Sequence, residues 1–175
     1  EALTYDKIQL ATLFPKETLL QKHSIRVFVK EKNRDMGYVD LVIEPYVEDW
    51  LDKVERTIDP ERRIAILEEA RHMAPQDNKI RERLIQEYRS VNKWPQTAKL
   101  LEEMVKEKPE EQKLFELFEV YESMKDSDGA VSVLRRLLQK TPEDAELRLR
   151  LARTLEKAKK VPDAIREYEA VLSRL

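Results

Sequence analysis

The apolar positions along this chain repeat with a spacing of 33 to 34 residues. Three prolines mark the spacing, because Pro75, Pro109 and Pro142 lie 34 and 33 residues apart. A leucine stands eight residues before each proline, and a leucine or phenylalanine stands nine residues after it. These residues are Leu67, Leu101 and Leu134 before the prolines, and Leu84, Phe118 and Leu151 after them. A period of this length is typical of stacked two-element units, each too thin to bury its own apolar face. The pattern therefore predicts a mainly α-helical solenoid.

Proline placement divides the chain from Pro45 onward into helices. Because proline is tolerated in a first helical turn and disrupts a helix interior, each proline marks a joint or a helix start. The prediction is about four antiparallel helix pairs, with helices at 46–57, 60–73, 77–91, 95–107, 111–125, 128–140, 144–158 and 162–174. The repeats then fall at about 45–75, 76–109, 110–142 and 143–175. The first is degenerate, because Arg63 stands where the later units carry the small residues Thr97, Ala130 and Ala164.

Residues 1–44 have a different pattern and form a separate predicted element. The runs 25–29 and 38–43 are rich in β-branched and aromatic residues, and the polar stretch 30–37 lies between them. This predicts a small β-hairpin with a moderately long loop, with a possible third strand near 5–12 and a short helix or turn at 15–22. So few strands are marginal alone. Two alternatives stay open: the hairpin docks on the first helices, or it meets a partner or a second copy.

The composition excludes several classes of function. Charged residues make up 39% of the chain, the formal net charge is −2, and acids alternate with bases, so no basic field exists for a nucleic acid. Cysteine is absent and glycine occurs only twice, which excludes thiolate metal sites and phosphate-binding glycine loops. The two histidines, His23 and His72, are not spaced as metal ligands. We therefore predict no enzyme, no catalytic residue, no metal and no small-molecule cofactor.

The repeat resembles the tetratricopeptide repeat (TPR) family, with divergent units. The last unit matches best, at Leu151, Ala152, Leu155, Ala164, Tyr168 and Val171. The preceding units match at Leu117, Tyr121, Ala130 and Leu137, and at Leu84, Tyr88, Leu101 and Met104. The early tryptophan of the family is replaced by Arg81, Leu114 and Arg148, and bulky Ile85 and Phe118 stand where the family has a small residue. The resemblance implies a TPR-like solenoid, which these bulky residues are expected to distort.

The resemblance also implies a function: a protein-interaction scaffold or adaptor whose first helices line a concave groove for a peptide or helix of a partner, within a larger assembly. The groove residues implied for this chain are Glu82, Gln86, Arg89, Phe115, Glu119, Glu122, Leu149, Arg153 and Glu156. Phe115 and Leu149 occupy equivalent places and offer apolar contacts one repeat apart, or else merely pack against neighbouring units.

Two alternative functions stay open. One is a self-assembling subunit, a homo-oligomer that uses the hairpin and the last repeat, which ends without a polar capping helix. The other is the regulatory domain of a larger enzyme. The chain starts at Glu1, which suggests an excised or processed segment, so any membrane anchor is expected outside it. The compartment stays open, with a bacterial cell envelope or the cytoplasm as alternatives.

Overall fold

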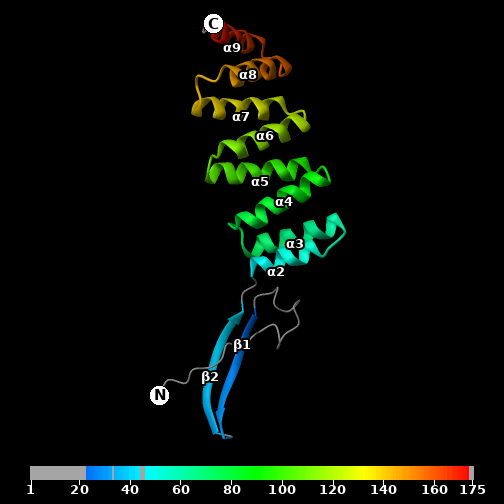
Figure 1. Cartoon of the computed structure of the whole chain (residues 1–175), viewed down its shortest axis with the longest axis vertical. Coiled ribbons are helices and arrows are strands. Elements are labelled where there is room, and N and C mark those ends of the chain that lie inside the picture. The colour runs from blue at the N-terminus through cyan, green and yellow to red at the C-terminus, as the bar shows by residue number, and fades with distance from the viewer. Residues whose placement is uncertain (1–22, 33, 44–45, 174–175) are drawn as a thin grey trace. The chain divides into compact units, whose positions relative to one another are not determined.

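The computed structural model describes residues 23–32, 34–43 and 46–173. The chain divides into two compact units between Leu84 and Ile85, and each is described by itself. The possible third strand at 5–12 and the helix or turn at 15–22 lie outside the described residues. In the described part the fold is mainly helical, with eight helices in paired packing after a two-stranded hairpin (Figure 1). The predicted fold class is therefore confirmed, whereas the domain and repeat boundaries stay a prediction.

The hairpin consists of β1 (His23–Glu31) and β2 (Arg34–Ile43), which pair antiparallel. The predicted loop at 30–37 is wrong, because the strands continue through most of it and Glu31 pairs with Arg34. The polar residues join the ladder, and Lys30 forms an ion pair with Asp35 at 3.5 Å. The ladder shifts its register after Val29, and Gly37, with a φ of 135°, takes a conformation that side chains disfavour.

The two faces of the hairpin differ in polarity. On one face Arg26 forms a bidentate ion pair with Asp40, at 2.7 and 3.0 Å, and its guanidinium lies 4.0 Å from the ring centre of Tyr38. The opposite face takes its side chains from apolar register pairs, among them Val27 with Val39. Both of these valines are exposed. Two strands alone are marginal in stability, so the exposed valines can gain stability from a further contact.

The helices agree with the predicted ranges to within two residues at each end. Their bounds are α2 Val47–Glu55, α3 Pro60–Met73, α4 Asn78–Ser90, α5 Trp94–Glu107, α6 Glu111–Ser123, α7 Ser127–Lys140, α8 Ala145–Lys157 and α9 Val161–Leu172. Pro60, Pro95 and Pro162 lie in first turns, as the proline pattern predicts. None of these helices is long and apolar enough to cross a membrane.

Side-chain N-caps stabilise the starts of several helices, and residues with a left-handed backbone conformation follow the ends of others. The carboxylates of Asp126 and Asp144 accept the backbone N–H groups of Gly129 and Leu147, both at 2.9 Å. Asn92, Lys125 and Lys159 have φ values of 58°, 58° and 59°, which close the turn after a first helix in the three complete repeats. The next residue then donates its N–H back across the helix end, as Asp126 does to the carbonyl of Tyr121 at 2.9 Å.

Residues 85–173 stack in chain order, each helix of α5 to α9 packing on the next (Figure 1). Leucine is the most frequent residue in this core, and the small residues Thr97, Ala130 and Ala164 are all buried. Ile85 and Phe118 are also buried. Whether they distort the superhelix stays a prediction.

Tyr121 joins three helices of this stack. Its hydroxyl on α6 donates to the Glu102 carboxylate on α5 at 3.2 Å, and Arg136 on α7 donates to the other oxygen of Glu102 at 3.0 Å. Burial raises the pKa of Tyr121 to about 12, with a smaller effect from the neighbouring Glu102 carboxylate. The Tyr121 ring lies directly over Gly129, where a side chain would not fit. These contacts fix how α6 sits between its two neighbours.

Candidate protein-binding surface

The candidate site lies on the first helices of the repeats in the second unit. We call it the first-helix surface, and it consists of Gln86 and Arg89 on α4, Phe115, Glu119 and Glu122 on α6, and Leu149, Arg153 and Glu156 on α8. The ninth predicted residue, Glu82, is exposed and belongs to the first unit, so it is not part of this surface as defined.

Phe115 and Leu149 are the apolar residues of this surface, and both are half-buried. Each follows a fully packed residue on its own helix, because Leu114 is buried on α6 and Leu147 is buried on α8. Helical periodicity explains this placement, because a residue one or two positions along the sequence from a buried residue lies at the edge of the buried face of the helix. Phe115 and Leu149 therefore anchor in the repeat array and still keep part of their apolar surface open.

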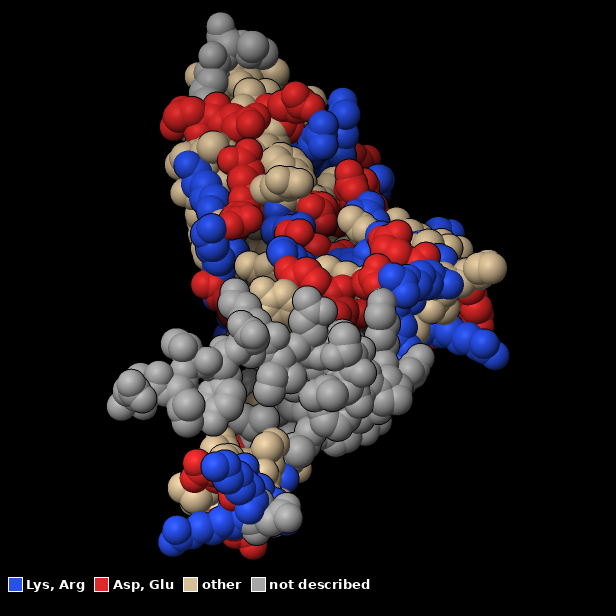
Figure 2. Space-filling model, turned by 60° about the horizontal axis from the view of Figure 1, so that its bottom comes forward, with Lys and Arg blue, Asp and Glu red and all other residues tan. Residues whose placement is uncertain are grey.

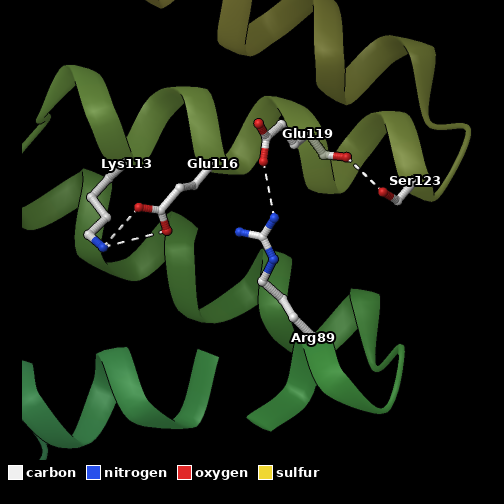
Figure 3. Close-up of polar contacts among 5 residues, drawn as sticks. All are labelled: Arg89, Lys113, Glu116, Glu119 and Ser123. Atoms are coloured by element: carbon white, nitrogen blue, oxygen red, sulfur yellow. Dashed lines mark hydrogen bonds and ion pairs between the residues drawn. The ribbon is translucent and has the colours of Figure 1, made fainter. Parts of the chain in front are cut away.

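Arg89 and Glu119 link α4 to α6 across a repeat boundary (Figure 3). The Nη2 atom of Arg89 lies 3.0 Å from Oε2 of Glu119. The backbone carbonyl of Glu119 also accepts the Ser123 hydroxyl at 2.9 Å. Since Arg89 is half-buried and Glu119 is exposed, water screens the pair, which is expected to contribute less than about 1 kcal/mol. The pair therefore orients two predicted groove residues more than it stabilises the fold.

A second ionic link lies one repeat further along. Glu122 on α6 accepts Lys157 of α8 at 3.3 Å, so the first helices of consecutive repeats are again tied by one acid and one base. Glu156 accepts the Tyr168 hydroxyl of α9 at 3.2 Å. Arg153 is exposed on α8. Acids and bases thus alternate over this surface, and no single charge sign dominates; Figure 2 shows the same mixture of blue basic and red acidic residues on the face that it draws.

Sequence reasoning missed one pair that lies beside Phe115. Lys113 and Glu116 on α6 form an ion pair at 3.2 Å, with only 13% and 21% of their side chains exposed (Figure 3). Their spacing of three residues on one helix is a usable signal for such a pair. Because both side chains are mostly enclosed, this pair is the more rigid polar element next to the apolar anchor.

A small cavity lies beside this surface. Its volume is about 130 Å³, and it opens between the α6–α7 turn and the end of α8, lined by Tyr121, Glu122, Lys125, Asp126, Ser127, Ala130, Thr154 and Lys157. Pockets for cofactors usually enclose about 300–1,000 Å³, so this cavity is smaller than that range. Within the described ranges, no group of His, Asp and Glu side chains is arranged to hold a metal ion.

Comparison with known proteins identifies the repeat. Residues 122–174 match the tetratricopeptide repeat family model, which confirms the predicted resemblance for that part of the chain. A comparison with the curated proteins finds no match to the sequence. Residues 122–174 are therefore similar to the tetratricopeptide repeat, a fold that is typically non-catalytic and that generally mediates protein–protein interactions.

The fold is similar to solved structures of MamA. A MamA AMB-1 structure superposes with a TM-score of 0.54 at 19% identity, over 73% of this chain and 78% of that chain. The MamA MSR-1 structure superposes with a TM-score of 0.53 at 20% identity, over 73% of this chain and 76% of that chain. The MamA structure from Desulfovibrio magneticus RS-1 superposes with a TM-score of 0.51 at 14% identity, over 73% of this chain and 74% of that chain. At these identities the likeness establishes a common TPR fold, and the predicted site residues stay a prediction.

Proposed function

We propose that this chain is a non-enzymatic scaffold or adaptor whose first-helix surface binds a peptide or an amphipathic helix of a protein partner within a larger assembly. The observation that carries the proposal is the pair of half-buried apolar side chains, Phe115 and Leu149, at equivalent places on consecutive first helices. An apolar residue that is held at its base and open at its tip loses little conformational entropy when a partner covers it.

The ionic links around these anchors support the same function. The charges compensate each other within two ion pairs, Arg89 with Glu119 and Glu122 with Lys157. Because the charges are already paired, recognition depends on apolar contact, while exposed carboxylates remain able to accept hydrogen bonds from a partner backbone. This arrangement suits a partner with apolar side chains at regular spacing, such as one face of an amphipathic helix.

Variants of the two anchors test the proposal. Phe115→Ala and Leu149→Ala are expected to weaken partner capture by the full chain, measured by affinity capture with mass spectrometry against the unchanged chain. Each variant should lose only about 1 kcal/mol of stability, because folding removes less apolar area of a half-buried side chain from water than of a fully buried one. The matched control is Leu147→Ala on α8, which removes a buried side chain and should cost about 2–5 kcal/mol.

Two results contradict the proposal. If the Phe115 and Leu149 variants unfold as readily as the Leu147 control, these residues are packing residues. If both variants stay folded and capture the same partners in the same amount as the unchanged chain, the first-helix surface is not the binding site.

A second candidate function is self-assembly through the hairpin. The exposed Val27 and Val39 form a cross-strand pair on the apolar face, and a hairpin with such a face gains stability from a second copy. Sedimentation velocity over a hundredfold concentration range tests this. Val27→Lys with Val39→Glu should abolish any association, whereas a chain that stays monomeric throughout excludes the candidate.

A further inference from the structure

The two outer edges of the hairpin differ in regularity. Among the described residues neither edge pairs with a further strand, so β1 and β2 each present backbone N–H and C=O groups. On β2 the ladder shifts its register at Met36, an extra residue without a partner in β1, and the next residue, Gly37, has a φ of 135°. Such a bulge bends a strand and opposes further pairing along its edge. β1 contains no extra residue and keeps a regular edge over all nine of its residues.

The charges of β1 are compensated within its own hairpin. Arg26 forms an ion pair with Asp40 at 2.7 Å. Lys30 forms an ion pair with Asp35 at 3.5 Å. Basic side chains protect a sheet edge when their charge repels an approaching strand. Because both cations are paired with carboxylates of β2, this protection is weakened on the edge of β1.

A second copy of β1 matches this edge in one register. Opposite residues of an antiparallel pair share a face and a hydrogen-bonding direction, so the two-fold axis between identical strands passes through a residue. An axis at Val27 pairs all nine residues of both strands and sets Arg26 opposite Phe28 of the second copy. An axis at Arg26 or at Phe28 shortens the overlap and sets Arg26 opposite Arg26 or Lys30 of the second copy. Like charges in opposite positions are unfavourable, so the register centred on Val27 is selected.

This register extends contacts that the hairpin already makes. Val27 is 41% exposed and its cross-strand partner Val39 is 50% exposed. An axis at Val27 joins the two valine pairs into one apolar row across the sheet. On the other face, the guanidinium of Arg26 lies 4.0 Å from the ring centre of Tyr38, and Phe28 of the second copy supplies a ring on its open side. Two strands are marginal in stability, whereas more strands with an apolar face are stable.

We propose that β1 pairs edge to edge with β1 of a second copy, antiparallel about a two-fold axis at Val27. The product is a four-stranded sheet in the order β2–β1–β1–β2. This inference rests on the second candidate function, self-assembly, and assigns the contact to the β1 edge instead of the apolar face. The first-helix surface takes no part in it.

Cysteine substitution tests the register, because the chain has no cysteine of its own. In Val27→Cys the two thiols meet at the axis, where opposite Cα atoms lie about 4.5–5.5 Å apart, within the span of a disulfide. Mild oxidation of the full chain should therefore give a covalent dimer. Val39→Cys is the matched control, on the same face and similarly exposed. Its two thiols lie three strand spacings apart, about 14 Å, so this variant should give no covalent dimer.

Charge substitutions at the axis test the same contact without a covalent link. Val27→Glu and Val27→Lys each set like charges opposite one another, and each should weaken self-association in sedimentation velocity by about fivefold or more. An equimolar mixture of the two variants sets an acid opposite a base and should restore association. Circular dichroism at 222 nm checks that each variant keeps its helices.

Three results overturn the inference. The first is a chain that stays monomeric at all concentrations, which excludes the second candidate function as well. The second is cross-linking of Val39→Cys as readily as Val27→Cys, since the hairpins then pack face to face and self-assembly stands without the edge contact. The third is self-association that Val27→Glu does not weaken. None of these results bears on the first-helix surface, which the variants of Phe115 and Leu149 test.

Discussion

Gly129 on α7 is the position where one added methyl group should disturb the repeat stack most clearly. A Cβ atom built there would lie 2.6, 2.7 and 2.8 Å from the Cδ1, Cε1 and Cγ atoms of Tyr121. These distances are shorter than real side chains tolerate, so the ring or the α6–α7 packing has to move. The ring is held by the hydrogen bond of its hydroxyl to Glu102 on α5. Gly129→Ala therefore strains contacts among three helices.

The expected change in the free energy of unfolding for Gly129→Ala combines one gain and two losses. Alanine gains about 1 kcal/mol over glycine in a helix. Overpacking a tight interface costs about 1–3 kcal/mol, and displacing Tyr121 from Glu102 loses a hydrogen bond worth about 1 kcal/mol. With about 2 kcal/mol for overpacking, the net loss for Gly129→Ala is about 2 kcal/mol. For the whole chain of 175 residues, the Tm should then fall by about 4–8 °C.

The assay is thermal unfolding followed by circular dichroism at 222 nm, for Gly129→Ala, Tyr121→Leu and the double variant. Leucine at position 121 removes the ring that meets the new methyl group. In the Tyr121→Leu background, Gly129→Ala should therefore raise the Tm, because only the gain in helix propensity remains. A higher Tm for Gly129→Ala in the unchanged chain would refute the reasoning, since it would show that the ring does not press on α7.

Three further predictions follow from local structure. Lys125→Gly should stabilise the chain by about 1 kcal/mol in urea unfolding, because Lys125 has a φ of 58° that only glycine adopts without strain. Unchanged stability would mean that this turn is unstrained. Asp144→Ala should cost about 1 kcal/mol by losing the cap on the Leu147 N–H, whereas Asp144→Asn, which keeps an acceptor, should cost much less. Equal losses would exclude the cap. Because the folded chain holds the phenolic proton of Tyr121 up to a pKa of about 12, against about 10 when unfolded, its contribution to stability is complete below pH 10 and is lost as the pH rises towards 12. Tyrosinate absorbance at 295 nm should show a late-titrating component that Tyr121→Phe reduces, and a titration unchanged by that variant would contradict the prediction.

The helical part was predictable because proline and leucine spacing carry local information. Pro60, Pro95 and Pro162 begin helices in the structure as the sequence indicates, and the small residues Ala130 and Ala164 are buried where the repeat pattern requires them. Helix starts and core stripes depend on a few neighbouring residues, so periodicity is sufficient to find them.

The hairpin turn and the contacts of the site depend on geometry that periodicity does not contain. The polar run 30–37 has loop composition, yet its charges pair across the two strands, as Lys30 and Asp35 do. The pair of Arg89 with Glu119 joins residues 30 positions apart in the sequence, and the rotation of each helix decides whether they meet. The close contact of Tyr121 with Gly129 also depends on that rotation. These features became visible only in three dimensions.

The chain-order packing of α5 to α9 has a mechanical consequence. Because each of these helices leans on its immediate neighbours in sequence, folding of residues 85–173 needs no long loop closures and should be fast. A pulling force applied to this unit should peel it helix by helix from an end, as a staircase of small extensions in place of one abrupt rupture. Under load such a stack should therefore yield gradually, one helix at a time, instead of failing at a single point.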